Sequence, residues 1–181
     1  MYEELHAIAL DSIKEVFSLA TIDTDALLKQ HPHLLEKKAT FVTLNKQGSL
    51  RGCIGSILPH RSLLEDVSSN AISAAFRDSR FEVLRRNELD NIELEVSVLT
   101  VPVVLPYADT QELKSKIQVG RDGVILQLDN HQATFLPQVW ESLPSFEGFF
   151  ASLCQKAGCE NSCLEKHPNI YTYQVQKIKS N

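Results

Sequence analysis

Apolar residues recur at helical spacing in several stretches of the chain, with polar residues between them. This pattern predicts amphipathic helices over residues 3–19, 24–31, 62–78, 110–117 and 145–157. Ser62 and Glu65 are spaced so that each side chain can bind a free amide of the first helical turn. The last helix is expected to start after Ser145 and to end at Gly158, because these residue types favour the two ends of a helix.

Other stretches alternate apolar and polar residues, which is typical of half-buried strands. A turn is expected at residues 45–48, between two alternating runs. The predicted strands form a hairpin over residues 38–57, a single strand over 92–99, a second hairpin over 120–139 and one final strand over 170–178.

Helices and hairpins intermix without the regular strand–helix–strand order of a parallel sheet. We therefore expect an α+β fold in which an antiparallel β-sheet packs against helices. With 181 residues the chain is long enough for one substantial core. No repeat or clear linker divides it, so residues 1–181 are expected to form a single domain with room for a small subdomain.

Composition narrows the class of protein. An apolar content of 43% and a charged content of 23% are ordinary for a globular domain. The net charge of −5 argues against a protein that coats nucleic acid. No apolar run reaches the roughly 20 residues that span a bilayer, and the first residues are acidic rather than basic as in a signal peptide. The sequence therefore predicts a cytoplasmic protein that does not bind membranes.

The cysteines and histidines indicate neither a disulfide framework nor a metal site. In the cytoplasm all four cysteines are expected to be reduced thiols. Three of them precede His167 in a C-x4-C-x3-C-x3-H series, which is wider than the usual zinc motifs. The cysteines are Cys53, Cys154, Cys159 and Cys163. Loop or surface positions without partners are expected for His31, His33, His60 and His131.

The stretch "LRGCIGS", residues 50–56, is the first candidate site. In a regular strand Arg51 and Cys53 project from one side, about 7 Å apart, while Leu50 and Ile54 face the core. A guanidinium at that distance favours the thiolate that a nucleophilic cysteine needs. Gly52 and Gly55 would leave room for a ligand to reach the backbone. In the structural alternative the cysteine is a small core residue, the glycines mark a β-bulge and the arginine forms an ion pair.

Polar residues in two neighbouring elements add to this candidate site. Asp78 falls on the apolar side of its predicted helix, with Asn70 at the edge, so its carboxylate needs a partner such as Arg80 or Arg51. Glu95 and Ser97 lie on the polar side of the strand over residues 92–99. There the Glu95 carboxylate could act as a base or bind a cation. In the alternatives, Asp78 marks a hydrated helix end and the polar strand face meets water.

Several motifs in a fixed order make the chain resemble the AMMECR family from about Leu5 to Val175. Ser79 stands where a proline is common in that family, and a tryptophan usual soon after "KAG" is missing. The matching stretches are "FVTL" (41–44), "LRGCIG" (50–55), "NAISAAFRDSRF" (70–81), "LEVSVLT" (94–100), "GRDGV" (120–124), "FLPQVW" (135–140) and "KAG" (156–158).

The resemblance implies a larger domain and a smaller subdomain, with the "LRGCIG" segment in the cleft between them. It implies Memo-type and radical S-adenosylmethionine proteins as partners, and it names no cofactor. Cys53, Arg51 and Glu95 are the candidate catalytic residues. The candidate substrate-binding residues are Gly52, Gly55, Asn70, Asp78, Arg80, Ser97 and Gln138.

Two functions remain open at this point. In the first, the protein is an enzyme or enzyme component that uses Cys53 and Arg51 on an anionic, nucleotide-like or peptide-like substrate. In the second, it binds a ligand, an RNA or a partner in the same cleft without catalysis. An interaction scaffold whose glycines and cysteine serve the fold alone is a third reading.

Overall fold

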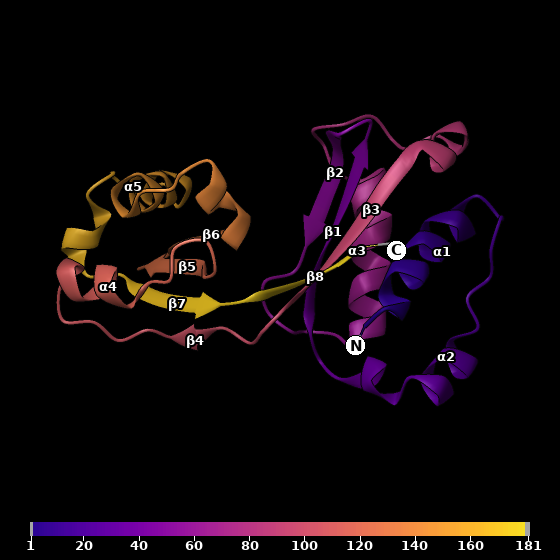
Figure 1. Ribbon diagram of the computed structural model, residues 1–181, viewed down its shortest axis with the longest axis horizontal. Coiled ribbons are helices and arrows are strands. Elements are labelled where there is room, and N and C mark those ends of the chain that lie inside the picture. Colours follow the sequence, from indigo (N-terminus) through magenta and orange to yellow (C-terminus); the bar gives the residue numbers. More distant parts are fainter. Residues whose placement is uncertain (1, 180–181) are drawn as a thin grey trace. The chain divides into compact units, whose positions relative to one another are not determined.

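The computed structural model describes residues 2–179, and the chain forms two compact units (Figure 1). Unit 1 contains the chain up to Leu99 and again from Gln176, and unit 2 contains Thr100–Val175. Each unit has its own four-stranded antiparallel sheet and helices, so the α+β class is confirmed, with two sheets instead of one. Among the described residues, no helix is both long and apolar enough to cross a membrane.

Unit 1 has the strand order β2-β1-β3-β8. The strands are β1 (Ala39–Lys46), β2 (Ser49–Gly55), β3 (Ile92–Leu99) and β8 (Val175–Lys179). The helices are α1 (Glu4–Val16), α2 (Thr24–Gln30) and α3 (Leu63–Phe76), with short 3-10 helices η1 (Pro32–Leu35) and η2 (Arg86–Asn91). The predicted capping of α3 is confirmed, because the Ser62 hydroxyl accepts from the Glu65 N–H and the Glu65 carboxylate accepts from the Ser62 N–H.

One face of this sheet forms the core of unit 1 with α1 and α3, which Figure 1 shows beside β1 and β3. Val42 and Leu44 of β1 and Val96 of β3 are fully buried there. Alternation along the strands therefore places the neighbouring odd-numbered residues of β1 and β3 on the opposite face, which we call the outer face.

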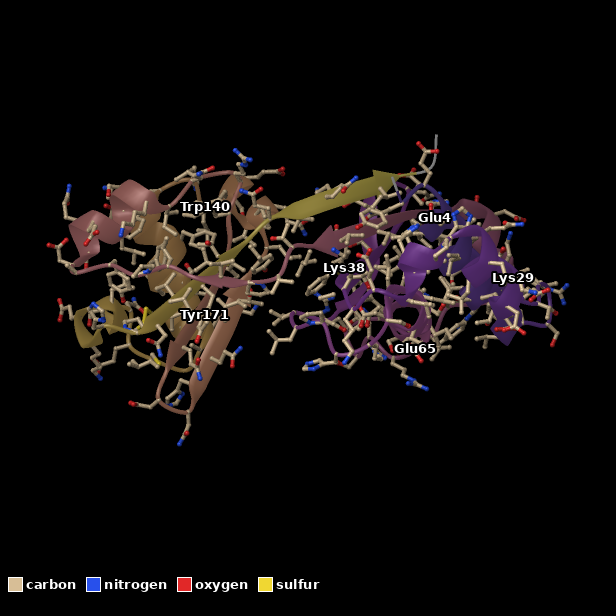
Figure 2. The ribbon with its side chains drawn as sticks, turned by 90° about the horizontal axis from the view of Figure 1, so that it is seen from below. Glu4, Lys29, Lys38, Glu65, Trp140 and Tyr171 are labelled. Atoms are coloured by element: carbon tan, nitrogen blue, oxygen red, sulfur yellow. A yellow bond between two sulfur atoms is a disulfide. The ribbon has the colours of Figure 1, made fainter. Side chains whose placement is uncertain are left out.

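Unit 2 has the strand order β4-β7-β5-β6. The strands are β4 (Val103–Val104), β5 (Gly123–Leu128), β6 (His131–Phe135) and β7 (Asn169–Tyr173). The helices are α4 (Thr110–Lys116), α5 (Phe146–Lys156), η3 (Pro137–Glu141) and η4 (Cys163–Lys166). Trp140, labelled in Figure 2, stacks on Phe149 with ring centroids 3.6 Å apart and donates its indole N–H to the Asp122 carbonyl.

The predicted final strand is divided between the two sheets. The segment β7 belongs to unit 2 and β8 completes the sheet of unit 1, with Gln174 between them. The Gln174 N–H donates to the Thr100 hydroxyl at 2.8 Å, and the Thr100 N–H donates to the Gln174 carbonyl at 2.9 Å. The apolar alternation continues through this point, so the sequence pattern does not reveal the division.

The expectation of four reduced cysteines is wrong. Cys154 of α5 and Cys163 of η4 form a disulfide, and both residues are buried in unit 2. The pairing depends on how the chain after α5 folds back over that helix, which residue spacing alone does not show. Cys53 and Cys159 are free thiols and half-buried.

Candidate functional site

The strand β2 is an edge of its sheet and contains a β-bulge at the candidate site. Gly52 lies opposite Leu44 and Leu50 lies opposite Asn45, so Arg51 is an extra residue in the register. Leu50 therefore shares the outer face with Asn45 and is 43% exposed. The prediction that Leu50 faces the core is wrong because it assumed a regular strand.

The two glycines of this stretch allow close packing. A Cβ added to Gly52 would lie 2.2 Å from the carbonyl oxygen of Ala74 in α3. A Cβ added to Gly55 would lie 2.2 Å from the ring of Phe41, the neighbouring residue on β1. The protein itself therefore occupies the space that a ligand was expected to use at both positions. The bulge and this packing agree with the structural alternative for the glycines.

Arg51 is bound to Glu88 of η2 rather than directed to the thiol. Its Nε and Nη2 atoms donate to the two oxygens of Glu88 at 3.2 and 3.0 Å, and Lys46 donates to the same carboxylate at 2.8 Å. The side chains of Arg51 and Glu88 are each only 13% exposed. Hydrogen bonds from Arg51, and secondly from Lys46, lower the pKa of Glu88 to about 2. Sequence reasoning missed Glu88, because nothing in the spacing connects η2 with β2.

A cavity of about 420 Å³ opens beside this ion pair. It lies within unit 1 and has three cationic side chains, two carboxylates and one aromatic wall. Among the described residues, the Nη1 atom of Arg51 is buried without a hydrogen-bond partner. The cavity is lined by Lys46, Arg51, Phe81, Glu82, Arg85, Asn87 and Glu88, and Cys53 is outside this set.

The backbone of Cys53 is held by the segment that follows α3. Asp78 accepts from the Cys53 N–H at 2.9 Å, and Arg80 donates to the Cys53 carbonyl at 3.2 Å and to Asp78 at 2.7 Å. The predicted pairing of Asp78 with Arg80 is confirmed, although α3 ends before Asp78. The hydrogen bonds from Arg80, with a smaller effect from the Cys53 N–H, hold the pKa of Asp78 well below its usual range. These contacts satisfy peptide groups that an edge strand leaves free.

The Cys53 side chain begins a row of polar side chains across the outer face. Cys53 lies opposite Thr43, and the thiol and the Thr43 hydroxyl are 3.4 Å apart. Thr43 lies opposite Glu95 of β3, whose carboxylate is 3.5 Å from the ammonium of Lys177 in β8. The row thus crosses all four strands and brings the predicted Glu95 to the face that carries Cys53.

Asn70 belongs to a buried network rather than to the cavity. Its amide donates to the Thr40 carbonyl at 3.0 Å and to the Asp66 carboxylate at 2.9 Å. Asp66 is fully buried and also accepts from Ser56 and Arg61. Sequence reasoning missed Asp66 because it follows Glu65 in the first turn of α3, where acidic residues are usually exposed. The signal that could have found it is its place on the same side of the helix as the buried Leu63. The network connects α3 to the strands that carry the site.

The remaining two candidates lie in different places. Ser97 is buried in β3 on the outer face, opposite Phe41. Gln138 is an exposed residue of η3 in unit 2. Most of the predicted residues therefore lie on or beside β2, but only Arg51 among them lines the cavity, and Asn70 belongs to the buried network instead.

Comparison with known proteins identifies the chain. The AMMECR1 family model matches residues 6–178. The protein belongs to the AMMECR1 family. The resemblance drawn from the motifs is thus confirmed over nearly the whole chain.

Relatives of this AMMECR1-family protein occur among archaea. A protein of Thermococcus onnurineus is 41% identical over 156 residues, covering 80% of this chain and 74% of the relative. A protein of Sulfolobus acidocaldarius is 39% identical over 171 residues, covering 89% and 73% of the two chains. The crystal structure of the uncharacterized protein PH0010 from Pyrococcus horikoshii has a TM-score of 0.84 and 35% identity, covering 97% of this chain and 89% of that one. The neighbour shares the fold of both units.

Proposed function

We propose that this AMMECR1-family protein binds an anionic small molecule in the cavity beside Arg51. The observation that carries the proposal is the buried Nη1 atom of Arg51, which lacks a partner among the described residues although Arg51 lines a cavity. A buried donor without an acceptor is costly, and a ligand oxygen would remove that cost. The cavity volume of about 420 Å³ is within the range of small-molecule sites, roughly 300–1,000 Å³.

The charges around the cavity favour an anion. Glu88 already accepts from both Lys46 and Arg51, which leaves the exposed Arg85 side chain as a second anchor. Phe81 supplies an apolar wall for a flat group, as in a nucleotide-like or peptide-like ligand. Because Cys53 does not line the cavity, this proposal does not require the thiol to react.

The test is a thermal-shift screen of nucleotides, sugar phosphates, dicarboxylates and short peptides, followed by calorimetry on any compound that stabilises the protein. Arg85→Ala should weaken the binding of that compound by about 1–3 kcal/mol, because a charge-assisted hydrogen bond is lost. Arg86→Ala is the matched control, since Arg86 is an exposed neighbour outside the cavity lining. A screen without any stabilising anion, or equal losses in the two variants, would contradict the proposal.

The second candidate function is an enzyme or enzyme component that uses Cys53, favoured by the row of Cys53, Thr43 and Glu95. The thiol is half-buried, and a hydroxyl and a carboxylate follow it on the same face. Arg80, which binds the Cys53 carbonyl, would hold an anionic part of the substrate in place of Arg51.

Cys159 provides an internal control for this second function, because it is also a free, half-buried thiol. We expect iodoacetamide to modify Cys53 several times faster than Cys159 near neutral pH, as for an activated thiol. Mass spectrometry of the two peptides measures both rates in one sample. Equal rates would leave anion binding as the supported function.

The cytoplasmic location stays a prediction. The Memo-type and radical S-adenosylmethionine partners also stay predictions, and a pull-down from the native host would test them.

A further inference from the structure

Three side chains of unit 1, away from the cavity and the Cys53 row, come together at the start of the chain. One nitrogen each of His31 and His33 and one carboxylate oxygen of Glu4 lie within 4.8 Å of one another. All three residues are half-buried. Across the part of the chain that the structure describes, no other trio of His, Cys, Asp or Glu donors converges in this way.

Local structure explains how the two imidazoles meet. Pro32 begins η1 and keeps the preceding residue out of helical geometry, so α2 stops and His31 adopts φ −130° and ψ 71°. The His31 and His33 rings then lie 5.9 Å apart, edge against face. The expectation that these histidines lack partners is wrong, because Glu4 in the first turn of α1 binds His33, and the His33 ring contacts that of His31. It is also wrong for His131, whose Nδ1 atom is 3.0 Å from the Ala157 carbonyl oxygen.

Glu4 supplies the carboxylate from α1. Figure 2 labels this residue among the side chains of unit 1. Its Oε1 atom is 2.5 Å from Nε2 of His33, and its side chain is 15% exposed, compared with 31% for His33. The donors are therefore partly withdrawn from water but still reachable by an ion from solution.

We propose that Glu4, His31 and His33 form a binding site for a divalent transition metal, with Zn²⁺ as the best fit. Imidazole nitrogens select zinc and similar metals over Ca²⁺ and Mg²⁺, which prefer oxygen ligands. Donors about 2.0–2.1 Å from a tetrahedral zinc ion lie roughly 3.3 Å apart. One pair of donors is 2.5 Å apart and all pairs lie within 4.8 Å, so modest side-chain rotations would let the three donors surround one ion. Water would complete the coordination.

Metal binding would replace the Glu4–His33 hydrogen bond by coordinate bonds from all three side chains to one ion. The ion would then link α1 to the α2–η1 junction. Because Glu4 and the two histidines come from distant parts of the sequence, the ion would connect segments that the unfolded chain keeps apart. An ion that binds only the folded state raises its stability according to its concentration and affinity. The site would therefore act as a structural clamp on unit 1.

The experiment titrates Zn²⁺ alone into protein carrying Cys53→Ser and Cys159→Ser, which removes the free thiols as competing ligands. We expect one equivalent to bind and to raise the melting temperature. His31→Gln and His33→Gln should each weaken binding by at least about tenfold, since each removes one ligand. His60→Gln is the control, because His60 is an exposed histidine of the same unit outside the trio.

Circular dichroism without metal checks that each variant is folded, and Glu4→Gln tests the carboxylate separately. Co²⁺ serves as a second probe: visible ligand-field bands without a sulfur charge-transfer band support nitrogen and oxygen ligation. The proposal would be overturned if the protein carrying only Cys53→Ser and Cys159→Ser failed to bind one equivalent of Zn²⁺. Unchanged Zn²⁺ affinity in both His31→Gln and His33→Gln would overturn it as well.

Discussion

Glu88 shows how one side chain can determine what a candidate residue does. The sequence motif suggested that Arg51 acts on Cys53, but two hydrogen bonds commit its guanidinium to Glu88. Glu88 lies far away in sequence, so residue spacing could not reveal the ion pair. The motif did indicate the correct strand, and the local sequence supplied the pairing of Asp78 with Arg80, which are two positions apart.

The Glu88 ion pair predicts a specific dependence of stability on pH. Its folded-state pKa of about 2 is below the ordinary value of 4.5, so its contribution is present above pH 4.5 and is lost as the pH falls towards 2. Glu88→Gln should therefore unfold more easily at pH 7 and lose about 1–2 kcal/mol less between pH 5 and pH 2 than the parent protein. Urea unfolding at several pH values measures this difference. If the unfolding free energies of the two proteins fell equally with decreasing pH, another carboxylate would govern acid unfolding.

At the scale of elements, β2 is fitted closely to α3 on one face and to Phe41 on the other. Helix ends and hairpins were predictable because their signals are local, such as the Ser62 and Glu65 pair before α3. The bulge at Arg51 depends on the register with β1, and the disulfide depends on the return of the chain after α5. The spacing of apolar residues along the chain shows neither feature. This explains why the sequence predicts the wrong face for Leu50 and reduced thiols for Cys154 and Cys163.

The two glycines of β2 should differ in their tolerance of a methyl group. Gly52→Ala should cost about 2–3 kcal/mol of unfolding free energy, because the new Cβ meets the backbone carbonyl of Ala74. Gly55→Ala should cost less, about 1–2 kcal/mol, because the atom it meets is Cγ of Phe41 and the whole ring must change its χ1 rotamer, whereas the backbone of α3 stays in place. Chemical denaturation of the two variants makes the comparison. A smaller loss for Gly52→Ala than for Gly55→Ala would mean that β2 can move away from α3.

At the scale of the whole molecule, the chain leaves unit 1 after β3 and returns to it in β8. The fold class was predictable, since it follows from intermixed helices and hairpins. The presence of two sheets was not, because β7 and β8 read as one continuous strand. The Thr100–Gln174 hydrogen bonds join the first residue of unit 2 to the residue that precedes β8.

Because β8 completes the first sheet, Ile178 should support unit 1 specifically. This side chain is 7% exposed and belongs to the core formed with α1 and α3. Ile178→Ala should cost about 2–4 kcal/mol and speed hydrogen exchange in β1 and β3, while β5 of unit 2 keeps its protection. Lys177→Ala is the control on the same strand, and its loss should stay below about 1 kcal/mol. Equal effects on β5 would show that the two units unfold together.

The insertion of unit 2 between β3 and β8 has a consequence for biosynthesis. A ribosome releases all of unit 2 before it releases the last strand of unit 1. At that stage the edge of β3 in nascent unit 1 lacks its hydrogen-bonded neighbour β8, whereas all the strands of unit 2 have been synthesised. During that interval, the unpaired edge is the part of the molecule that chaperones would need to shield.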